Sequence, residues 1–159
     1  MKELETRIIK IDVANIRKTL IEKGGIKVKE ENQINDKYDF EDGRLLARKG
    51  YARIRTIDDL LNKKQVFYMT TKKMLSQGKF KEMEENETIV DDKLAAEGIF
   101  ASLGLKLKQS INKYRESYSI EGGLVEIDIN DTTFCPFPYI EIETNSEENL
   151  EKIVKLLVN

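Results

Sequence analysis

Eight segments of the sequence alternate between apolar and polar residues with a period of two, the pattern of β-strands that have one apolar face. The segment KELETRI is typical, because Glu3, Glu5 and Arg7 fall on one face and mainly apolar side chains fall on the other. The other segments are 36–40, 51–55, 65–73, 79–86, 110–118, 124–130 and 139–144. Most are joined by short connections rich in turn residues, which favours antiparallel pairing.

Three further segments repeat apolar residues at helical spacing, namely 11–25, 91–105 and 145–159. In the first, Val13, Ile16 and Leu20 share one face, Asp12 is a suitable N-cap, and two glycines follow. Helices packed on a mainly antiparallel sheet predict an α+β, β-dominated fold. No repeat, low-complexity tract or Pro/Ser-rich linker interrupts the chain, so we expect residues 1–159 to form a single domain.

The polar faces of these strands carry pairs of charges of both signs, such as E-x-E, R-x-R and K-x-R. Any one pair fits a solvated sheet face with weak cross-strand ion pairs. Seven strands carry such charge pairs, which favours a second interpretation. In it the sheet closes into a barrel, with the apolar faces outside, under the helices, and the charges in the lumen. Carboxylates bind Mg²⁺ or Mn²⁺, and Arg and Lys bind phosphate oxygens, so such a lumen suits a metal-chelated polyphosphate.

The composition narrows the chemistry. With 27 Lys and Arg against 29 Asp and Glu, the formal charge is -2, which gives no general attraction to nucleic acid or to a membrane surface. The chain has no histidine and a single cysteine, so catalysis by histidine and the usual zinc sites are excluded, and a bound metal must take oxygen ligands. No signal sequence is recognisable and no apolar run approaches the roughly 18 residues of a membrane span. We therefore expect a cytoplasmic protein with neither nucleic-acid nor membrane partners.

Taken in order along the whole chain, these segments resemble the motifs of the CYTH superfamily, the triphosphate tunnel metalloenzymes. ELETR is similar to the family's opening E-x-E-x-K, and YIEIE is similar to its closing E-I-E. Between them the resemblance runs through NDKYDF, YARIR, TTKK, KEMEENETIVDD, SINKYRESY and EIDIN. The resemblance implies a closed eight-stranded antiparallel β-barrel that forms a tunnel, here with about three flanking helices. Family members include class IV adenylate cyclases, thiamine triphosphatases and inorganic triphosphatases.

The resemblance also implies the site residues. The carboxylates that would match metal ligands for Mg²⁺ or Mn²⁺ are Glu3, Glu5, Glu84, Asp128, Glu141 and Glu143. The cations that would match the triphosphate-binding residues are Arg7, Arg53, Arg55, Lys72, Lys113 and Arg115. Of these, the expected catalytic residues are Glu3, Glu5 and Arg7. Glu82 fits the same strand as Glu84 but could equally pair with a neighbouring cation, and Glu126 matches no motif and is interpreted as structural.

The sequence departs from the family pattern at three places. Arg7 stands where the motif has lysine, so a phosphate contact is kept, but proton transfer is not expected because arginine does not deprotonate. Lys81 stands where arginine is usual. The segment DTTFCPFPYIEIE lacks the glycine that usually precedes the closing strand, and its two prolines predict a rigid loop of different shape.

Three functions fit these residues. The first is a metal-dependent phosphohydrolase acting on inorganic triphosphate, thiamine triphosphate or a nucleoside triphosphate. The alternative is a class IV adenylate cyclase, although the His-Phe element in which such cyclases resemble one another is missing from this histidine-free sequence. The third is a non-catalytic module that binds polyphosphate or nucleotide, which the replacement of the motif lysine by Arg7 favours. Each predicts a small-molecule triphosphate as the partner, and a homodimer is compatible with all of them.

Overall fold

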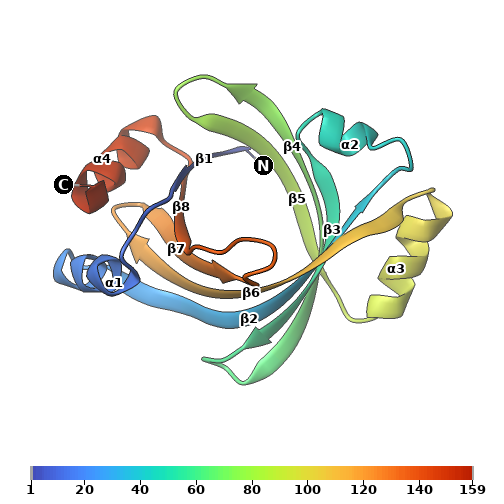
Figure 1. The fold of residues 1–159 in the computed structure, drawn as a ribbon, viewed down its shortest axis with the longest axis horizontal. Helices are drawn as coiled ribbons and strands as arrows, with labels where there is room; N and C mark the ends of the chain where they lie inside the picture. Colours follow the sequence, from blue (N-terminus) through green and yellow to red (C-terminus); the bar gives the residue numbers. More distant parts are fainter. Residues whose placement is uncertain (1, 159) are drawn as a thin grey trace.

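A computed structural model describes residues 2–158 of the chain and contains eight strands and four helices (Figure 1). The strands are β1 (Lys2–Ile8), β2 (Ile26–Asp39), β3 (Tyr51–Asp59), β4 (Lys64–Gln77), β5 (Lys81–Val90), β6 (Lys106–Ile120), β7 (Gly123–Asn130) and β8 (Tyr139–Thr144). The helices are α1 (Val13–Glu22), α2 (Arg44–Ala47), α3 (Lys93–Ser102) and α4 (Glu147–Val158).

All eight strands pair antiparallel in one closed barrel, in the order β1-β5-β4-β3-β2-β6-β7-β8, with β8 returning to β1. Figure 1 looks into the barrel and shows the helices on its outside, with α1 and α4 on one side and α2 and α3 on the other. The prediction of a β-dominated, eight-stranded closed barrel is confirmed. No helix among the described residues is long and apolar enough to cross a membrane.

Apolar packing on the outside of the barrel determines which side chains face inward. Ile140 and Ile142 of β8 are fully buried in a cluster with Leu20 of α1 and Leu150 of α4. Burying each such side chain stabilises the fold by about 1.5–3 kcal/mol. Because side chains alternate along a strand, the residues between and beyond these isoleucines point into the barrel. A second apolar cluster, under α3, orients β2 and β3 in the same way.

The three predicted helices form where their caps indicate. The Asp12 carboxylate accepts a hydrogen bond from the Asn15 amide at 3.2 Å, and the Asp92 carboxylate accepts one from the Ala95 amide at 3.0 Å. Helix α2 was not predicted, because four residues are too few to show a helical period. It is held by Asp39, whose carboxylate accepts hydrogen bonds from the backbone at the start of this short helix.

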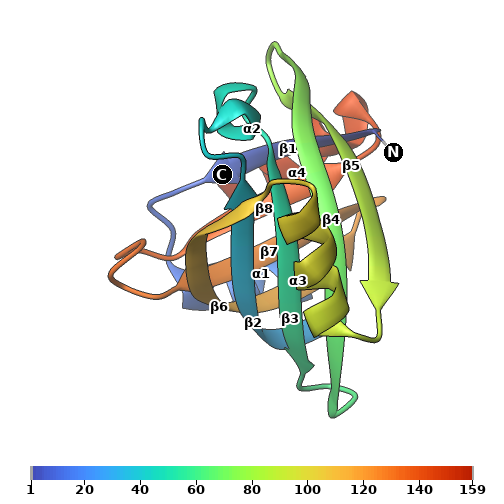
Figure 2. The same cartoon turned by 90° about the vertical axis from the view of Figure 1, so that its right-hand side faces the viewer.

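Several strands are longer than the apolar–polar alternation of the sequence predicted. Strand β2 begins at Ile26, ten residues before the predicted segment, and β4 and β6 have 14 and 15 residues. Figure 2 shows the long β4–β5 hairpin projecting beyond one end of the barrel. The early part of β2 was missed because it is mainly charged and exposed, without an apolar face to reveal the period.

Candidate active site

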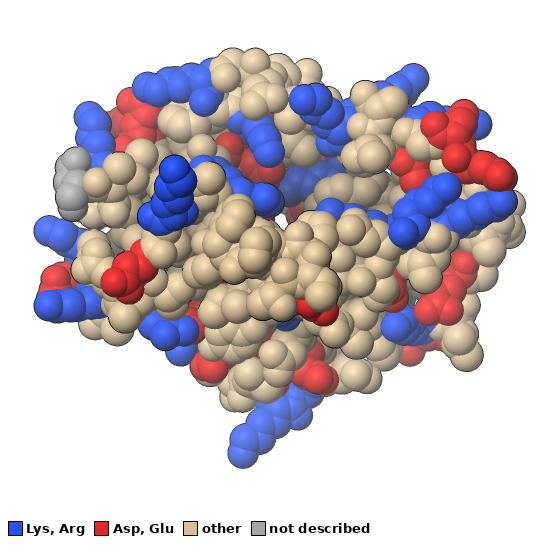
Figure 3. All heavy atoms as spheres, in the orientation of Figure 1, with Lys and Arg blue, Asp and Glu red and all other residues tan. Residues whose placement is uncertain are grey.

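The barrel encloses a cavity of about 520 Å³ lined mainly by charged and polar side chains. Of residues 2–158, ten lysines and arginines and six glutamates line it, an excess of positive charge in a protein whose net charge is negative. Figure 3 shows lysine and arginine atoms gathered around the hollow in the centre of this face. A volume of this size holds a small molecule, and the charge excess favours a polyanion.

The acidic part of the cavity is built by β1 and β8. Glu5 lies directly opposite Glu143 in the antiparallel register, and Glu3 is two residues earlier on the same face of β1. Carboxylate oxygens of Glu3, Glu5 and Glu143 all lie within 4.8 Å of one another. Three carboxylates at this separation repel one another strongly unless protons or cations neutralise them. We call these three residues the glutamate triad.

Lys72 of β4 supplies one neutralising charge. Its Nζ atom lies 2.8 Å from Glu3, 3.0 Å from Glu5 and 3.5 Å from Glu85, and only 9% of its side chain is exposed. Burial by itself lowers the pKa of Lys72, but the nearby Tyr51, Glu5 and Glu3 outweigh it and raise that pKa. The ammonium therefore stays charged and occupies the place next to the triad where a cation is most favourable.

A proton supplies further neutralisation. Burial, followed by the negative charges of Glu126 and Glu3, raises the pKa of Glu143 far above its ordinary value. Burial also acts to raise the pKa of the neighbouring Glu126, but Arg115 outweighs it and lowers that pKa. Without a bound cation, this environment therefore favours the protonated form of Glu143 next to the ionised Glu126 carboxylate. A divalent cation at the triad would displace this proton.

The basic wall comes from β2 and β3, across the cavity, and includes Lys37, Arg53 and Arg55. Within residues 2–158, Arg55 has no carboxylate at ion-pair distance, and its Nε donates to the Asn35 side chain. Burial, then the charges of Arg53 and Arg115, lower the pKa of Arg55 to about 10. Burial, Arg53 and Arg55 likewise lower the pKa of Lys37. Three cations gathered with fewer carboxylates than positive charges are suited to bind an anion, and we call this wall the anion site.

Arg53 adds a further sign of a missing acceptor. Its Nη1 donates to the Tyr51 hydroxyl at 2.8 Å, and its Nη2 lies 3.5 Å from Glu87. The Nε–H of Arg53, however, is buried and has no acceptor among the described residues. Buried donors are normally satisfied, so this one is consistent with an absent ligand oxygen.

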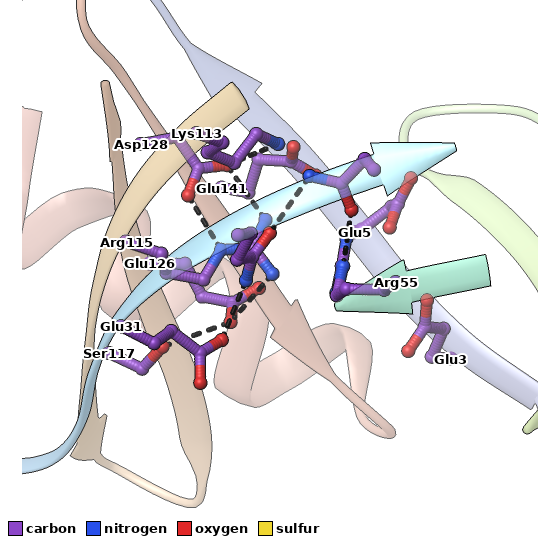
Figure 4. A network of polar contacts seen from close by, with 12 residues as sticks. Glu3, Glu5, Glu31, Arg55, Lys113, Arg115, Ser117, Glu126, Asp128 and Glu141 are labelled. Atoms are coloured by element: carbon purple, nitrogen blue, oxygen red, sulfur yellow. Dashed lines mark hydrogen bonds and ion pairs between the residues drawn. The ribbon is translucent and has the colours of Figure 1, made fainter. Parts of the chain in front are cut away.

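A third group, from β6 and β7, connects the two walls (Figure 4). Arg115 is bidentate to Asp128, with distances of 2.6 and 2.8 Å, and its Nη1 lies 3.2 Å from Glu126. Burial alone raises the pKa of Asp128, but Arg115 and Lys113 outweigh it and lower the value to about 2. Burial and Arg115 lower the pKa of Lys113 to about 8. Asp128 is thus engaged by two cations and lies apart from the glutamate triad.

Arg7 lies at the opposite end of β1 from Glu3. Its Nη2 donates to Glu141 at 3.1 Å, and its guanidinium lies 4.1 Å from the centre of the Tyr139 ring. Burial alone lowers the pKa of Arg7, but Glu141 and Tyr139 outweigh it and raise that pKa. Glu141 is therefore paired with a cation, unlike the triad, and Arg7 remains charged.

Comparison with known proteins now identifies the family. The family model for the CYTH domain matches residues 1–159. The chain belongs to the CYTH family. Members of this family are metal-dependent enzymes that act on triphosphates, and they include adenylate cyclases and triphosphatases. A search of curated protein sequences finds no match.

Solved structures share the fold of this CYTH domain. A conserved hypothetical protein from Pyrococcus furiosus is 24% identical, with a TM-score of 0.77 and coverage of 98% of this chain and 90% of that chain. A candidate adenylate cyclase from Vibrio parahaemolyticus is 15% identical, with a TM-score of 0.72 and coverage of 98% and 84%. A candidate adenylyl cyclase from Hippeastrum, described as having a dominant triphosphatase activity, is 17% identical, with a TM-score of 0.70 and coverage of 96% and 84%.

One expected metal ligand lies outside the CYTH tunnel. Glu84 is on the outer face of β5, opposite Lys2 in the register with β1, and it pairs with Lys73 at 3.7 Å with 40% of its side chain exposed. Its placement among the tunnel carboxylates was wrong. Glu82 also faces outward and pairs with Lys2 at 3.5 Å. The physical reason is Val90, which shares this face of β5 and packs under α3.

The other expected residues do face the tunnel, but in separate groups. Glu3, Glu5 and Glu143 come together, whereas Glu141 and Asp128 are each paired with cations. The six expected cations also point inward, and five of them lie near the anion site or between the walls, whereas Lys72 sits against the triad. Their roles remain those proposed from the resemblance.

The sequence analysis missed several tunnel residues. On β5 the inward side chains are Lys81, Met83, Glu85 and Glu87, the face opposite to the one expected. Lys37 was missed because the predicted strand began only one residue before it. Glu126, interpreted as structural, lines the cavity, and its negative charge acts on Glu143. Its E-x-D spacing with Asp128 was visible in the sequence and could have indicated a shared face.

Proposed function

We propose that the protein is a divalent-cation-dependent triphosphatase that releases orthophosphate from the end of a triphosphate chain. The observation that supports this most directly is the opposition of two walls in one cavity. The glutamate triad, on one side, has more negative charge than its protein neighbours balance. The wall around Arg55, on the other side, has three cations, Lys37, Arg53 and Arg55, and among the described residues only Arg53 has a carboxylate at ion-pair distance, that of Glu87. A triphosphate with a divalent cation satisfies both.

The donor set of the triad fits such a cation. Glu3, Glu5 and Glu143 offer only carboxylate oxygens, which Mg²⁺ and Mn²⁺ prefer, and the Lys72 ammonium 2.8 Å from Glu3 shows that the triad already attracts a cation. When bound there, the cation would neutralise phosphate charge and acidify a water molecule. Lys72 would hold the carboxylates of Glu3 and Glu5 in place before the cation arrives.

The chain's own cations would do most of the binding. Arg53 and Arg55 would donate to the phosphate oxygens, and their planar guanidinium groups hold the chain in one orientation. Water then attacks the terminal phosphorus, the bond to the bridging oxygen breaks, and orthophosphate and the shortened chain leave. Negative charge builds on the leaving oxygens, and the same guanidinium groups stabilise it.

Two alternative functions of the same cavity predict different products. In an adenylate cyclase the ribose 3′-hydroxyl of ATP attacks the α-phosphorus, so cyclic AMP and pyrophosphate form. A non-catalytic module binds the triphosphate and leaves it unchanged. Both would use the two walls described above. The cyclase differs from the proposed triphosphatase in its nucleophile, and the binding module carries out no reaction.

One experiment separates the three functions. The protein is incubated with inorganic triphosphate, thiamine triphosphate or ATP, each with Mg²⁺ or Mn²⁺, and the products are resolved by chromatography. Orthophosphate supports the proposal, cyclic AMP with pyrophosphate supports the cyclase, and binding without turnover supports the module. Glu5→Gln is expected to abolish turnover, and Glu84→Gln, on the outer face of β5, is the matched control. Unchanged turnover in Glu5→Gln would overturn the assignment of the triad.

A further inference from the structure

The loop between β7 and β8, residues 131–138, lies inside the ring of strands in the view of Figure 1 and projects to the left of the barrel in Figure 2. Hydrogen bonds within the loop hold its backbone in this shape. The Asp131 carboxylate accepts hydrogen bonds from the backbone and hydroxyl of Thr133 at 3.0 and 2.8 Å. The Asp131 carbonyl accepts two more, from the amides of Phe134 and Cys135, at 3.0 Å each.

Both ends of this loop are also anchored. The side-chain amide of Asn130 donates to the Tyr139 hydroxyl at 3.0 Å, which joins the last residue of β7 to the first of β8. Pro136 and Pro138 restrict the backbone between them, because the proline ring locks φ. These contacts and the two prolines restrict the backbone of the loop at the edge of the cavity.

The loop carries two exposed aromatic side chains that differ in position. Phe134 is 46% exposed and lines the tunnel cavity. Phe137 is 45% exposed and is not part of the cavity lining. Equal exposure in one rigid loop makes Phe137 a natural reference for Phe134. Phe134 thus offers an exposed apolar ring at the edge of a cavity lined mainly by charged side chains.

Three aromatic rings line the cavity, and two of them are already covered. Lys37 and Arg53 lie over the Tyr51 ring, at 4.8 and 5.1 Å from its centre. Arg7 and Lys113 lie over the Tyr139 ring, at 4.1 and 5.8 Å. In the described part of the chain, no lysine or arginine lies over the third ring, that of Phe134. Its surface is therefore the one available to a flat group.

Phe134 also lies on the correct side of the phosphate site. Strand β8 starts at Tyr139, next to the loop, and reaches Glu143 of the triad after four residues, about 13 Å of strand. The cations of Arg7 and Lys113 lie beside Tyr139, between the loop and the triad. With the terminal phosphate at the triad, the other end of the chain points toward Phe134.

We propose that Phe134 is a stacking platform for a flat aromatic ring carried by the triphosphate substrate. This inference rests on the proposed function and narrows the substrate from any triphosphate to an organic one. A nucleobase and the rings of thiamine share this chemistry, since both offer a π-face and stack on phenylalanine. Phe134 would be a specificity residue, in contact with the organic group and away from the reacting phosphorus.

The test compares kcat/KM for ATP, thiamine triphosphate and inorganic triphosphate in the wild-type protein, Phe134→Ala and Phe137→Ala. Phe134→Ala is expected to lose roughly tenfold or more with at least one organic triphosphate, the size of one base–aromatic stacking contact. The organic triphosphate that is affected identifies the ring. Inorganic triphosphate should be turned over as before, which also shows that the variant is folded. Phe137→Ala should match the wild-type protein, and Phe134→Trp should restore the lost activity.

Two results would overturn the platform: an unchanged kcat/KM for both organic triphosphates in Phe134→Ala, or an equal loss with inorganic triphosphate. Failure of the proposed function looks different, because the wild-type protein then releases no orthophosphate from any of the three triphosphates. In that event, dissociation constants for the same three triphosphates, measured by calorimetry with Ca²⁺, still test Phe134. A preference for ring-bearing triphosphates that Phe134→Ala removes supports the platform, and the absence of such a preference refutes it.

Discussion

Replacement of Lys72 by methionine is expected to lower the stability of the fold and to raise its metal affinity. The side chain is buried, and its ammonium contacts three glutamates at 2.8, 3.0 and 3.5 Å. Each contact is favourable by a few kcal/mol at an effective dielectric constant of about 20, and desolvation offsets much of this. Removing one partner from a buried ion cluster therefore costs about 3 kcal/mol of unfolding free energy, or about 6–12 °C in Tm.

Metal affinity should change in the other direction. The ammonium of Lys72 repels a divalent cation at the glutamate triad, so Lys72→Met is expected to bind Mn²⁺ roughly tenfold or more tightly. At a concentration one hundred times its Kd, Mn²⁺ should then raise the unfolding free energy of the variant by about 2.7 kcal/mol. Turnover should still be lost, because the triad is no longer held for the substrate.

Lys73→Met is the matched control for this variant. Lys73 is the next residue of the same strand, points outward, and pairs with Glu84 at 3.7 Å with 56% of its side chain exposed. An exposed pair of this kind contributes about 0–1 kcal/mol. Stability is measured by urea unfolding with and without Mn²⁺, and Mn²⁺ affinity by calorimetry. If Lys72→Met is as stable as Lys73→Met, or binds Mn²⁺ no better than the wild-type protein, the reasoning is refuted.

Three further predictions concern other parts of the cavity. The pKa of Asp128 is about 2 in the folded protein against an ordinary value of 3.8, so its contribution of about 2 kcal/mol is present above pH 4 and disappears as the pH falls through 2. Acid unfolding should show this slope, and it should be flatter in Asp128→Asn. Arg55→Met should weaken triphosphate binding about 10–100-fold and should lower the unfolding free energy by only about 1–3 kcal/mol, because the partner it leaves behind within residues 2–158 is the neutral Asn35 amide and not a carboxylate. Glu3→Gln should weaken Mn²⁺ binding in calorimetry and Glu84→Gln should not; equal effects would contradict the placement of the two residues.

The fold could be predicted largely from the alternation of residues. On β1 and β8, the paired charges alternate with apolar or small side chains. Because Ile140 and Ile142 are buried on the outside of the barrel, Glu141 and Glu143 must point into the lumen. The same logic failed on β5, where both faces carry glutamates and Met83 is the one apolar residue of the central part. There the deciding residue was Val90, at the far end of the strand, and its burial depends on α3.

The separation of charges inside the barrel could not be predicted from the sequence. Glu141 and Glu143 are two residues apart on one strand, yet the first pairs with Arg7 and the second joins the triad. Neighbouring strands decide this difference. Glu5 lies opposite Glu143, and Arg7 lies opposite Glu141, so the register of β1 and β8 gives each glutamate a different partner. Register between strands that are over a hundred residues apart does not appear in local alternation.

The central claim is that the glutamate triad holds a divalent cation while the wall around Arg55 holds a triphosphate. Anomalous X-ray diffraction from crystals grown with Mn²⁺ and imidotriphosphate, a slowly hydrolysed analogue, tests it most directly. The account predicts one strong manganese peak bonded to oxygens of Glu3, Glu5 and Glu143, with analogue oxygens against Arg53 and Arg55. A manganese peak elsewhere in the tunnel, or an analogue bound away from these arginines, would contradict it.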